Sequence, residues 1–339
     1  MAHLCISDDR RHFTKDGKLF FWIGDTVWSA FTNPTIEEWQ EYLSYRKRQG
    51  FNVLQINTLP QWDRCTPDQG IYPYPVREDG SMDHGADVDQ RYTEHVLEIS
   101  RMAVKEGFQL ALVVDWANFI PGTWLTKMFP THAWPLAAIE KHVCWVTATF
   151  AEFQPVYIVS GDTDYRTDEP IVYYRRTIEL LKQRDPSALL TMHMTAGNTD
   201  IPDGLADMLD FYMYQSGHFA NMTDTLETIP KAFRDKYPLK PLLNGEPCYE
   251  NMPKMTGNRD VPPTEFFNGE EVYEASRRSI LAGADAGITY GANGLWNWNR
   301  NSSDAESQAG SMYAKPIHWH EAMCLPGAGK IASLKELIK

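Results

Sequence analysis

The chain has few cysteines and no stretch that would cross a membrane. Its 339 residues include only 5 cysteines, and none of them form a C-x-x-C pair. Scattered, unpaired cysteines are typical of free thiols in a reducing compartment and give no zinc-ligand spacing. No apolar run approaches the roughly 20 residues of a membrane span, and the N-terminus shows no basic segment followed by an apolar run. We therefore expect a cytoplasmic protein with no membrane partner.

Basic residues are scarce relative to acidic ones. The sequence contains 32 Lys and Arg residues against 45 Asp and Glu residues, which gives a net charge of −13. Without a basic stripe the chain has no surface that would neutralise a phosphate backbone, so we expect no nucleic-acid partner. The charge suits a protein that binds a neutral or weakly charged ligand.

Three common catalytic or cofactor motifs are also missing. There is no H-E-x-x-H, and His318 and His320 have no carboxylate at ligand spacing, so we expect no metal. No G-x-G-x-x-G follows the first apolar run, which argues against a dinucleotide. Ser160 and Gly161 lack the G-x-S-x-G frame of a serine hydrolase. We expect no cofactor.

What the chain does have is a regular alternation of apolar runs and helical patterns. The strand-like runs cover residues 20–23, 51–56, 110–114, 156–159, 189–193, 209–214, 242–243 and 287–291. Helical patterns cover residues 35–48, 92–105, 132–153, 170–184, 224–237 and 270–286. Eight strands alternating with helices predict an α/β fold, the (β/α)8 TIM barrel, as a single domain over residues 1–339. An open doubly wound sheet is the alternative.

Local signals refine this prediction. Thr35 followed by Glu38 predicts a capping box, and Gly50, Gly107 and Gly287 are expected to end helices. Turn residues within 4–19 predict a short N-terminal hairpin that closes the barrel floor. The longest loops, residues 60–89, 118–131 and 248–268, follow strands two, three and seven. Such loops lie on the C-terminal face of a barrel, where active sites are built.

Two carboxylates stand at the ends of strands far apart in the sequence. Asp162 follows the fourth strand, and Glu246 ends the seventh. In a barrel both would face one mouth, which is the arrangement that glycosidic-bond hydrolysis requires. We assign Asp162 as general acid and base and Glu246 as nucleophile, with Asp164 as a rival for the acid. A helix cap or an arginine pair is the structural alternative for each carboxylate.

Other polar and aromatic residues at predicted strand ends are candidates for binding a sugar. Carboxylates, amides and neutral histidines suit hydroxyl groups, and tryptophan faces suit sugar rings, while helix capping or core packing is the alternative for each. Tyr214 is considered for orienting Glu246. The candidate substrate-binding residues are Asp25, Trp28, Asn57, Asp115, Trp116, His193, Tyr214, Gln215, His218, Trp296 and Trp298.

Five segments, in the right order, resemble the apiosidase-like glycoside hydrolases. The family's opening motif resembles residues 20–28, and its second-strand entry resembles residues 49–55. Its Gly-Gly-Asp segment resembles Ser160-Gly161-Asp162, where serine replaces the usual first glycine. Its Gly-Glu-Pro-x-Tyr-Glu segment resembles residues 245–250, and its eighth-strand motif resembles residues 287–296. The resemblance covers about residues 5–335.

The resemblance implies a barrel of the retaining clan with acids on strands four and seven. It implies Asp162 as acid/base, Glu246 as nucleophile, and a plant-type glycan or short oligosaccharide as the substrate. Two other readings stay open from the residues alone: a non-catalytic carbohydrate-binding barrel, and a barrel lyase or isomerase. A lyase or isomerase would need a lysine or metal to stabilise an enolate, and no lysine lies at a predicted strand end. Oligomeric state is not readable.

Overall fold

Eight parallel strands form the centre of the molecule. They are β4 (Trp22–Thr26), β5 (Val53–Asn57), β6 (Gln109–Trp116), β7 (Val156–Gly161), β8 (Leu190–Thr191), β9 (Tyr212–Gln215), β10 (Leu242–Glu246) and β11 (Gly287–Tyr290). The computed structural model describes residues 3–61, 70–221, 224–256, 264–300 and 316–338.

The sheet curves until its two edges meet. Its strands pair in the order β8-β7-β6-β5-β4-β11-β10-β9, so strands that are consecutive in the chain lie side by side. At the two ends of this order, Asp210 N–H donates to Leu190 O over 2.9 Å, and Thr191 Oγ1 donates to Phe211 O over 2.9 Å. These bonds draw the edges together into a barrel, which confirms the predicted fold and excludes the open sheet.

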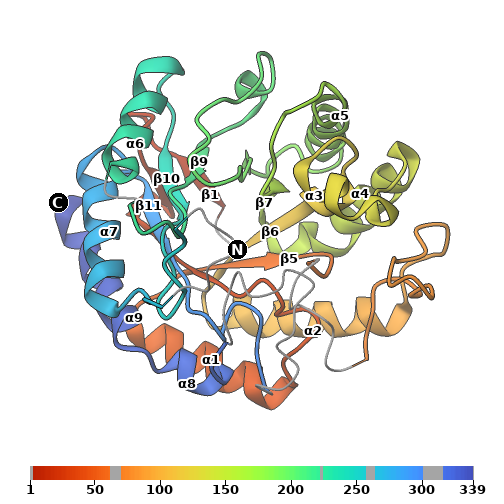
Figure 1. Ribbon diagram of the computed structural model, residues 1–339, viewed down its shortest axis with the longest axis horizontal. Helices are drawn as coiled ribbons and strands as arrows, with labels where there is room; N and C mark the ends of the chain where they lie inside the picture. The colour runs from red at the N-terminus through yellow and green to blue at the C-terminus, as the bar shows by residue number, and fades with distance from the viewer. Residues whose placement is uncertain (1–2, 62–69, 222–223, 257–263, 301–315, 339) are drawn as a thin grey trace.

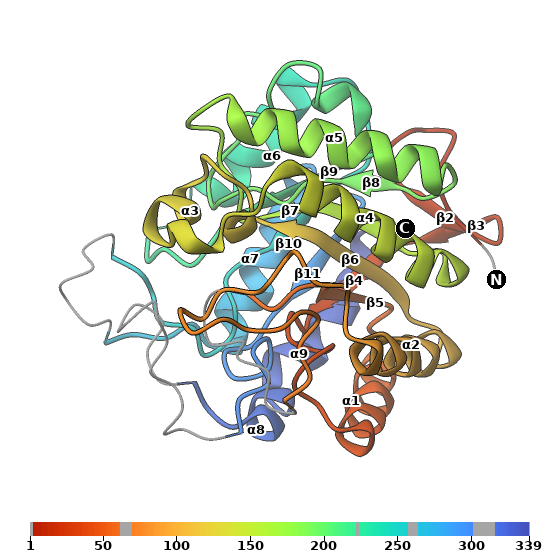
Figure 2. The ribbon, with the colours of Figure 1, turned by 90° about the vertical axis from the view of Figure 1, so that its right-hand side faces the viewer.

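Helices surround the strands, as Figures 1 and 2 show. They are α1 (Ile36–Gln49), α2 (Gln90–Lys105), α3 (Trp124–Met128), α4 (Leu136–Phe150), α5 (Glu169–Arg184), α6 (Thr225–Lys236), α7 (Gly269–Leu281), α8 (Trp319–Met323) and α9 (Pro326–Ile331). Between β8 and β9 a short 3-10 turn (Ala206–Met208) replaces a helix. Within the described residues, no helix has both the length and the apolar character needed to cross a bilayer.

Helix α1 shows how local sequence sets an element. Thr35 accepts a hydrogen bond from Glu38 N–H, and the Glu38 carboxylate accepts from Thr35 N–H, which completes the expected capping box. Gly50 ends the helix in the left-handed conformation at φ 95°. The residues between form one buried stripe, which is the face expected from their spacing of three and four: Trp39, Tyr42, Leu43 and Arg46.

The N-terminal segment forms a small sheet at the barrel floor. It has three antiparallel strands, β1 (Leu4–Ile6), β2 (Phe13–Lys15) and β3 (Lys18–Phe20), where a two-stranded hairpin was expected. Phe13 is fully buried and meets Phe211 edge to face, with ring centroids 5.0 Å apart. Phe211 immediately precedes β9, so this contact seals the N-terminal ends of the strands with apolar surface.

Two sequence-based boundaries are wrong. Phe20 belongs to β3, and the first barrel strand begins at Trp22 and continues through Asp25, because its pairing with β11 runs to that residue. Gly287 does not end a helix: α7 stops at Leu281, and Gly287 is the first residue of β11. A Cβ on Gly287 would lie 2.5 Å from Trp22 O, so this glycine allows close strand pairing.

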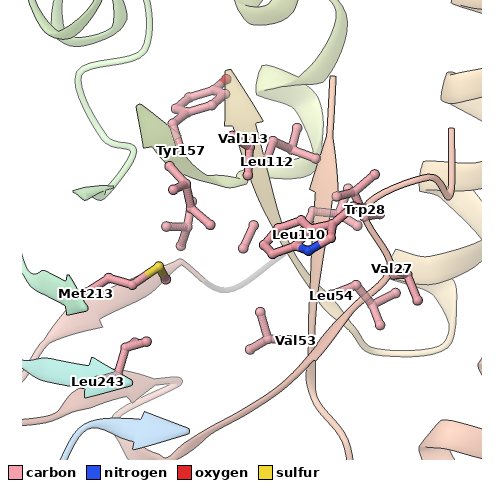
Figure 3. Close-up of a cluster of buried hydrophobic side chains, with 14 of the residues drawn as sticks. Val27, Trp28, Val53, Leu54, Leu110, Leu112, Val113, Tyr157, Met213 and Leu243 are labelled. Atoms are coloured by element: carbon pink, nitrogen blue, oxygen red, sulfur yellow. The ribbon is translucent and has the colours of Figure 1, made fainter. Parts of the chain in front are cut away.

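Apolar side chains from the strands pack into a buried cluster (Figure 3). Above them Gln55 crosses the interior: its Nε2 donates to Gly245 O over 3.1 Å, and its Oε1 accepts from Thr289 Oγ1 over 2.8 Å. Gly245 directly precedes Glu246. The bridge therefore ties β5 to the end of β10 and fixes the backbone beneath that carboxylate.

Candidate active site

A pocket of about 600 Å³ opens at the C-terminal ends of the strands. This volume falls within the roughly 300–1,000 Å³ of small-molecule sites. Asp162 and Glu246 both line it, as do residues from each of the three long loops. The loop residues are Gln61, Trp124, Tyr249, Met252 and Met255.

Asp162 stands immediately after β7 with its backbone in the left-handed region, at φ 51°. Its carbonyl accepts from Trp124 Nε1 over 2.8 Å, and its N–H donates to His193 Nδ1 over 3.2 Å. Non-glycine residues rarely adopt this conformation, and it persists here because both backbone polar groups are held. The turn aims residue 162 into the pocket instead of along the strand.

Gly161 makes room for the Trp116 ring. A Cβ at this position would lie 2.0 Å from Cε3 of Trp116, its neighbour in the β6–β7 register. Only glycine lets the Trp116 ring lie flat against the end of β7. The ring consequently forms a wall of the pocket beside Asp162.

Glu246 is the last residue of β10 and is almost fully buried. His218 Nε2 lies 3.0 Å from its Oε1, and His193 Nε2 lies 3.2 Å from its Oε2. Burial, together with the nearby charge of this carboxylate, raises the pKa of Tyr249. Burial alone would raise the pKa of Glu246, but the two histidines outweigh burial and lower that pKa to about 2.

The carboxylates of Asp162 and Glu246 lie close together. Asp162, His193 and Glu246 each present one polar atom, and these three atoms lie within 4.8 Å of one another. The two carboxyl groups come from the fourth and seventh barrel strands, as the sequence predicted. They therefore converge on one cavity.

Five of the predicted binding residues line the same pocket: Trp28, Trp116, Gln215, His218 and Trp296. Trp28 and Trp116 meet edge to face with ring centroids 5.4 Å apart. His193 packs against both rings but lies behind Glu246, fully buried, and does not line the pocket.

The structure places Asp25 and Trp298 away from the pocket. Asp25 points outward from β4, and its Oδ2 accepts from Arg46 Nε over 2.6 Å and from Tyr42 OH over 2.7 Å. Trp298 is fully buried and stacks on Trp319, with ring centroids 4.8 Å apart. Both contribute to packing between the barrel and its outer helices, so we leave them out of the proposed site.

Asn57, Asp115 and Tyr214 are also buried outside the pocket lining. Asp115 accepts from Thr177 of α5 over 2.6 Å, and burial raises its pKa to about 7. Tyr214 packs against Phe233 of α6 with ring centroids 6.1 Å apart, so it faces a helix and not Glu246. Strand ends alone do not distinguish side chains that face the pocket from those that face the helices.

Asp164, the rival acid, is held by two partners. Its Oδ1 accepts from Trp124 N–H over 2.9 Å at the start of α3, and its Oδ2 lies 2.5 Å from Arg166 Nε. Both oxygens of Asp164 are thus engaged, although the residue lines the pocket. A helix cap or an arginine pair is the structural alternative to a catalytic role that the sequence left open, and Asp164 makes both contacts.

Sequence reasoning missed Tyr249 and Trp124. Tyr249 lies in the Gly-Glu-Pro-x-Tyr-Glu segment, lines the pocket with Glu246, and accepts from Trp28 Nε1 over 3.2 Å through its hydroxyl. Its proximity to Glu246 in the sequence was the available signal. Trp124 holds Asp162 through its side chain and Asp164 through its backbone, but it begins the short helix α3 within residues 118–131, which were predicted as a loop.

Asp162, His193 and Glu246 are also spaced so that they could ligate a metal ion. A ligating imidazole needs a lone pair on the nitrogen that faces the ion. Here His193 Nδ1 already accepts from Asp162 N–H, so the nitrogen facing Glu246 carries the proton in the neutral ring. The hydrogen bonds favour a carboxylate site over a metal site.

A (β/α)8 barrel with two convergent carboxylates above its strands has the architecture of a glycoside hydrolase. The chain belongs to the apiosidase-like catalytic domain family, whose model matches residues 7–339. This assigns it as a glycoside hydrolase. No curated protein matches the chain.

Solved structures share the fold. A family 5 glycoside hydrolase from Bacteroides vulgatus superposes with a TM-score of 0.78 at 22% identity, covering 99% of this chain and 71% of that one. An endo-1,4-β-mannanase from Rhizomucor miehei gives a TM-score of 0.62 at 11% identity, with 99% of each chain covered. An exo-β-1,4-mannosidase from an Opitutaceae bacterium gives 0.58 at 13% identity, covering 98% of this chain and 62% of that one.

Proposed function

We propose that this protein is a retaining glycosidase in which Asp162 is the acid/base and Glu246 the nucleophile. The observation that carries the proposal is the approach of their carboxylate oxygens to within 4.8 Å inside one pocket. Retaining enzymes hold the two carboxyl groups about 5–5.5 Å apart, whereas inverting enzymes need roughly 6.5–9.5 Å to admit a water. The close approach of the two oxygens supports the retaining alternative.

The two carboxylates divide the reaction between them. Asp162 protonates the leaving oxygen while Glu246 attacks the anomeric carbon, so the glycosidic bond breaks and a glycosyl ester forms. Asp162, now ionised, takes a proton from water, whose oxygen attacks the same carbon and displaces Glu246. The lowered pKa of Glu246 keeps it ionised at neutral pH, as a nucleophile requires.

The charge of the pocket favours a neutral sugar. Among the described lining residues, Asp162, Asp164, Asp200 and Glu246 are acidic, and the one Lys or Arg is Arg166, which is paired with Asp164. Trp28, Trp116 and Trp296 supply ring surface for stacking. We propose a plant-type glycan or short oligosaccharide as substrate, bound with one sugar ring against these tryptophans.

Kinetics and labelling test the proposal. Wild-type protein is screened against nitrophenyl glycosides and pectic oligosaccharides, and the active substrate is then used with Glu246→Gln and Asp162→Ala. Glu246→Gln should lose hydrolysis while it stays folded. Asp162→Ala should recover turnover of the nitrophenyl substrate when azide is added, because azide needs no general base, and the glycosyl azide should retain the anomeric configuration.

Other outcomes would contradict the proposal. Turnover by Glu246→Gln at the wild-type rate would remove that residue from the nucleophile role. Azide product of inverted configuration from Asp162→Ala would exclude Asp162 as the acid/base. Loss of wild-type activity on treatment with a chelator, and its return with a divalent metal, would show that the three-residue cluster is a metal site. Sugar binding without turnover would favour the carbohydrate-binding barrel.

A further inference from the structure

We infer that His193 and His218 are positioning residues that fix both oxygens of Glu246, and that His193 also couples Glu246 to Asp162. The inference rests on the proposed roles of the two carboxylates. Neither the barrel fold nor membership of the family by itself gives His193 and His218 this positioning role.

Each ring has its tautomer set by a backbone group. His193 Nδ1 accepts from Asp162 N–H over 3.2 Å, and His218 Nδ1 accepts from Tyr249 N–H over 3.3 Å. A backbone N–H can only donate, so each Nδ1 carries a lone pair. In a neutral imidazole the proton must then sit on Nε2.

The two protonated nitrogens face different oxygens of the same carboxylate. His218 Nε2 lies 3.0 Å from Oε1, and His193 Nε2 lies 3.2 Å from Oε2. Protonating either ring a second time would place a proton between Nδ1 and the backbone N–H that it accepts from. Nε2 of His218 therefore hydrogen-bonds to Oε1. Nε2 of His193 lies 3.2 Å from Oε2 without hydrogen-bond geometry, so the His193 ring restrains this oxygen by close contact.

His193 also belongs to the turn that carries Asp162. Its N–H donates to Ser160 O over 3.3 Å, and its carbonyl accepts from Ser160 Oγ over 2.9 Å. Together with the bond from Asp162 N–H, these contacts hold His193 against both Ser160 and Asp162. One imidazole thus touches the backbone of the acid and the carboxylate of the nucleophile, so it sets their separation.

Amide replacements separate the two contacts of His193. An asparagine side chain reaches the position of Nδ1 and can still accept from Asp162 N–H, but it cannot reach Glu246. A glutamine side chain reaches the position of Nε2 and can still contact Glu246, but it removes the acceptor for Asp162 N–H. His218→Asn and His218→Gln separate the contacts to Tyr249 and Glu246 in the same way.

The test compares these variants on two glycosides of the sugar identified in the screen. One is a dinitrophenyl glycoside, whose leaving group departs without general-acid catalysis, and the other is a natural glycoside, whose leaving group must be protonated. His193→Asn should lower kcat/KM about 100-fold on both, because it removes the contact that restrains the nucleophile and small displacements of reacting groups cost about this factor. His193→Gln should lower kcat/KM at least about 10-fold more on the natural glycoside, because the misplaced group is the general acid. His218→Asn should lower both rates, and His218→Gln should restore most of the loss.

A buried histidine outside the pocket supplies the matched control. His142 bonds to Thr58 and Tyr74, and its replacement by Gln should leave the ratio of the two rates unchanged, whatever it costs in stability. Equal ratios in His193→Gln, His193→Asn and His142→Gln would overturn the inference, with thermal unfolding used to exclude misfolding. Because the wild-type and Glu246→Gln assays come first, failure of the proposed function is detected separately.

Discussion

Arg46 of α1 and Asp25 of β4 form an ion pair that is closed off from solvent, with 2.6 Å between Nε and Oδ2 and no exposed side-chain surface on either residue. Arg46 also donates to Met323 O over 2.9 Å, so the pair links the barrel to α1 and to the C-terminal helices. Asp25, which we proposed from the sequence as a sugar-binding residue, therefore connects the barrel strands to the outer helices.

We expect Arg46→Met to destabilise the protein by about 3–5 kcal/mol, because it leaves the Asp25 charge buried without its partner. The double variant Asp25→Leu, Arg46→Met should recover much of that loss, since no buried charge remains. Denaturant titrations measure both. Arg48, which is exposed two residues further on, is the control, and its replacement by Met should change stability by less than about 0.5 kcal/mol. Equal effects at 46 and 48 would refute the prediction.

The sequence was sufficient to predict the barrel because its signals are local and periodic. Glycine after an apolar run, the capping box at Thr35 and the buried stripe of α1 each depend on residues a few positions apart. Asp162 and Glu246 were found for the same reason, since each directly ends a strand. The compartment stays a prediction: Cys5, Cys144, Cys248 and Cys324 are free thiols, and Cys65 lies outside the described residues.

The rest of the site depends on which way a side chain faces. Asp25 and Trp28 are three residues apart, yet one pairs with α1 and the other lines the pocket. The register of β4 against β11 and the left-handed turn at Asp162 decide these directions, and neither leaves a periodic mark in the sequence. Tyr214 and Tyr249 show the same limit, because both are buried tyrosines but only Tyr249 lines the pocket.

The pKa of Glu246 makes a prediction for stability against pH. Burial raises this pKa, but His193 and His218 lower it to about 2, below the ordinary value of 4.5. A carboxylate with a depressed folded-state pKa stabilises the protein above its unfolded pKa, and this contribution is lost as the pH falls toward the folded value. The stability advantage of wild type over Glu246→Gln should therefore shrink between pH 4.5 and pH 2. If the stability difference between wild type and Glu246→Gln stays constant or grows as the pH falls over this range, the pKa of Glu246 is not lowered in the folded protein.

Gly161→Ala should damage the site with little effect on the fold. The new methyl group would lie 2.0 Å from Trp116 Cε3, so the ring must leave the wall of the pocket. Because small displacements of reacting groups cost about 100-fold in rate, we expect a loss of that order in kcat/KM, measured on the substrate from the screen. Gly329→Ala is the control, since a Cβ there meets no atom within 4 Å. Full activity in Gly161→Ala would mean that Trp116 does not border the substrate.

Tyr249→Phe tests whether the hydroxyl above β10 supports the nucleophile. The ring should stay in place, because its edge-to-face contact with His218, at 4.7 Å between centroids, needs no hydroxyl. The variant removes a polar group beside the Glu246 carboxylate, and interactions with charged groups contribute about 1.5–3 kcal/mol, or roughly 10- to 100-fold in rate. We expect kcat to fall by this factor. Tyr214→Phe, which alters a buried tyrosine facing α6, should leave kcat unchanged, and equal losses in the two variants would show that a general loss of packing is responsible.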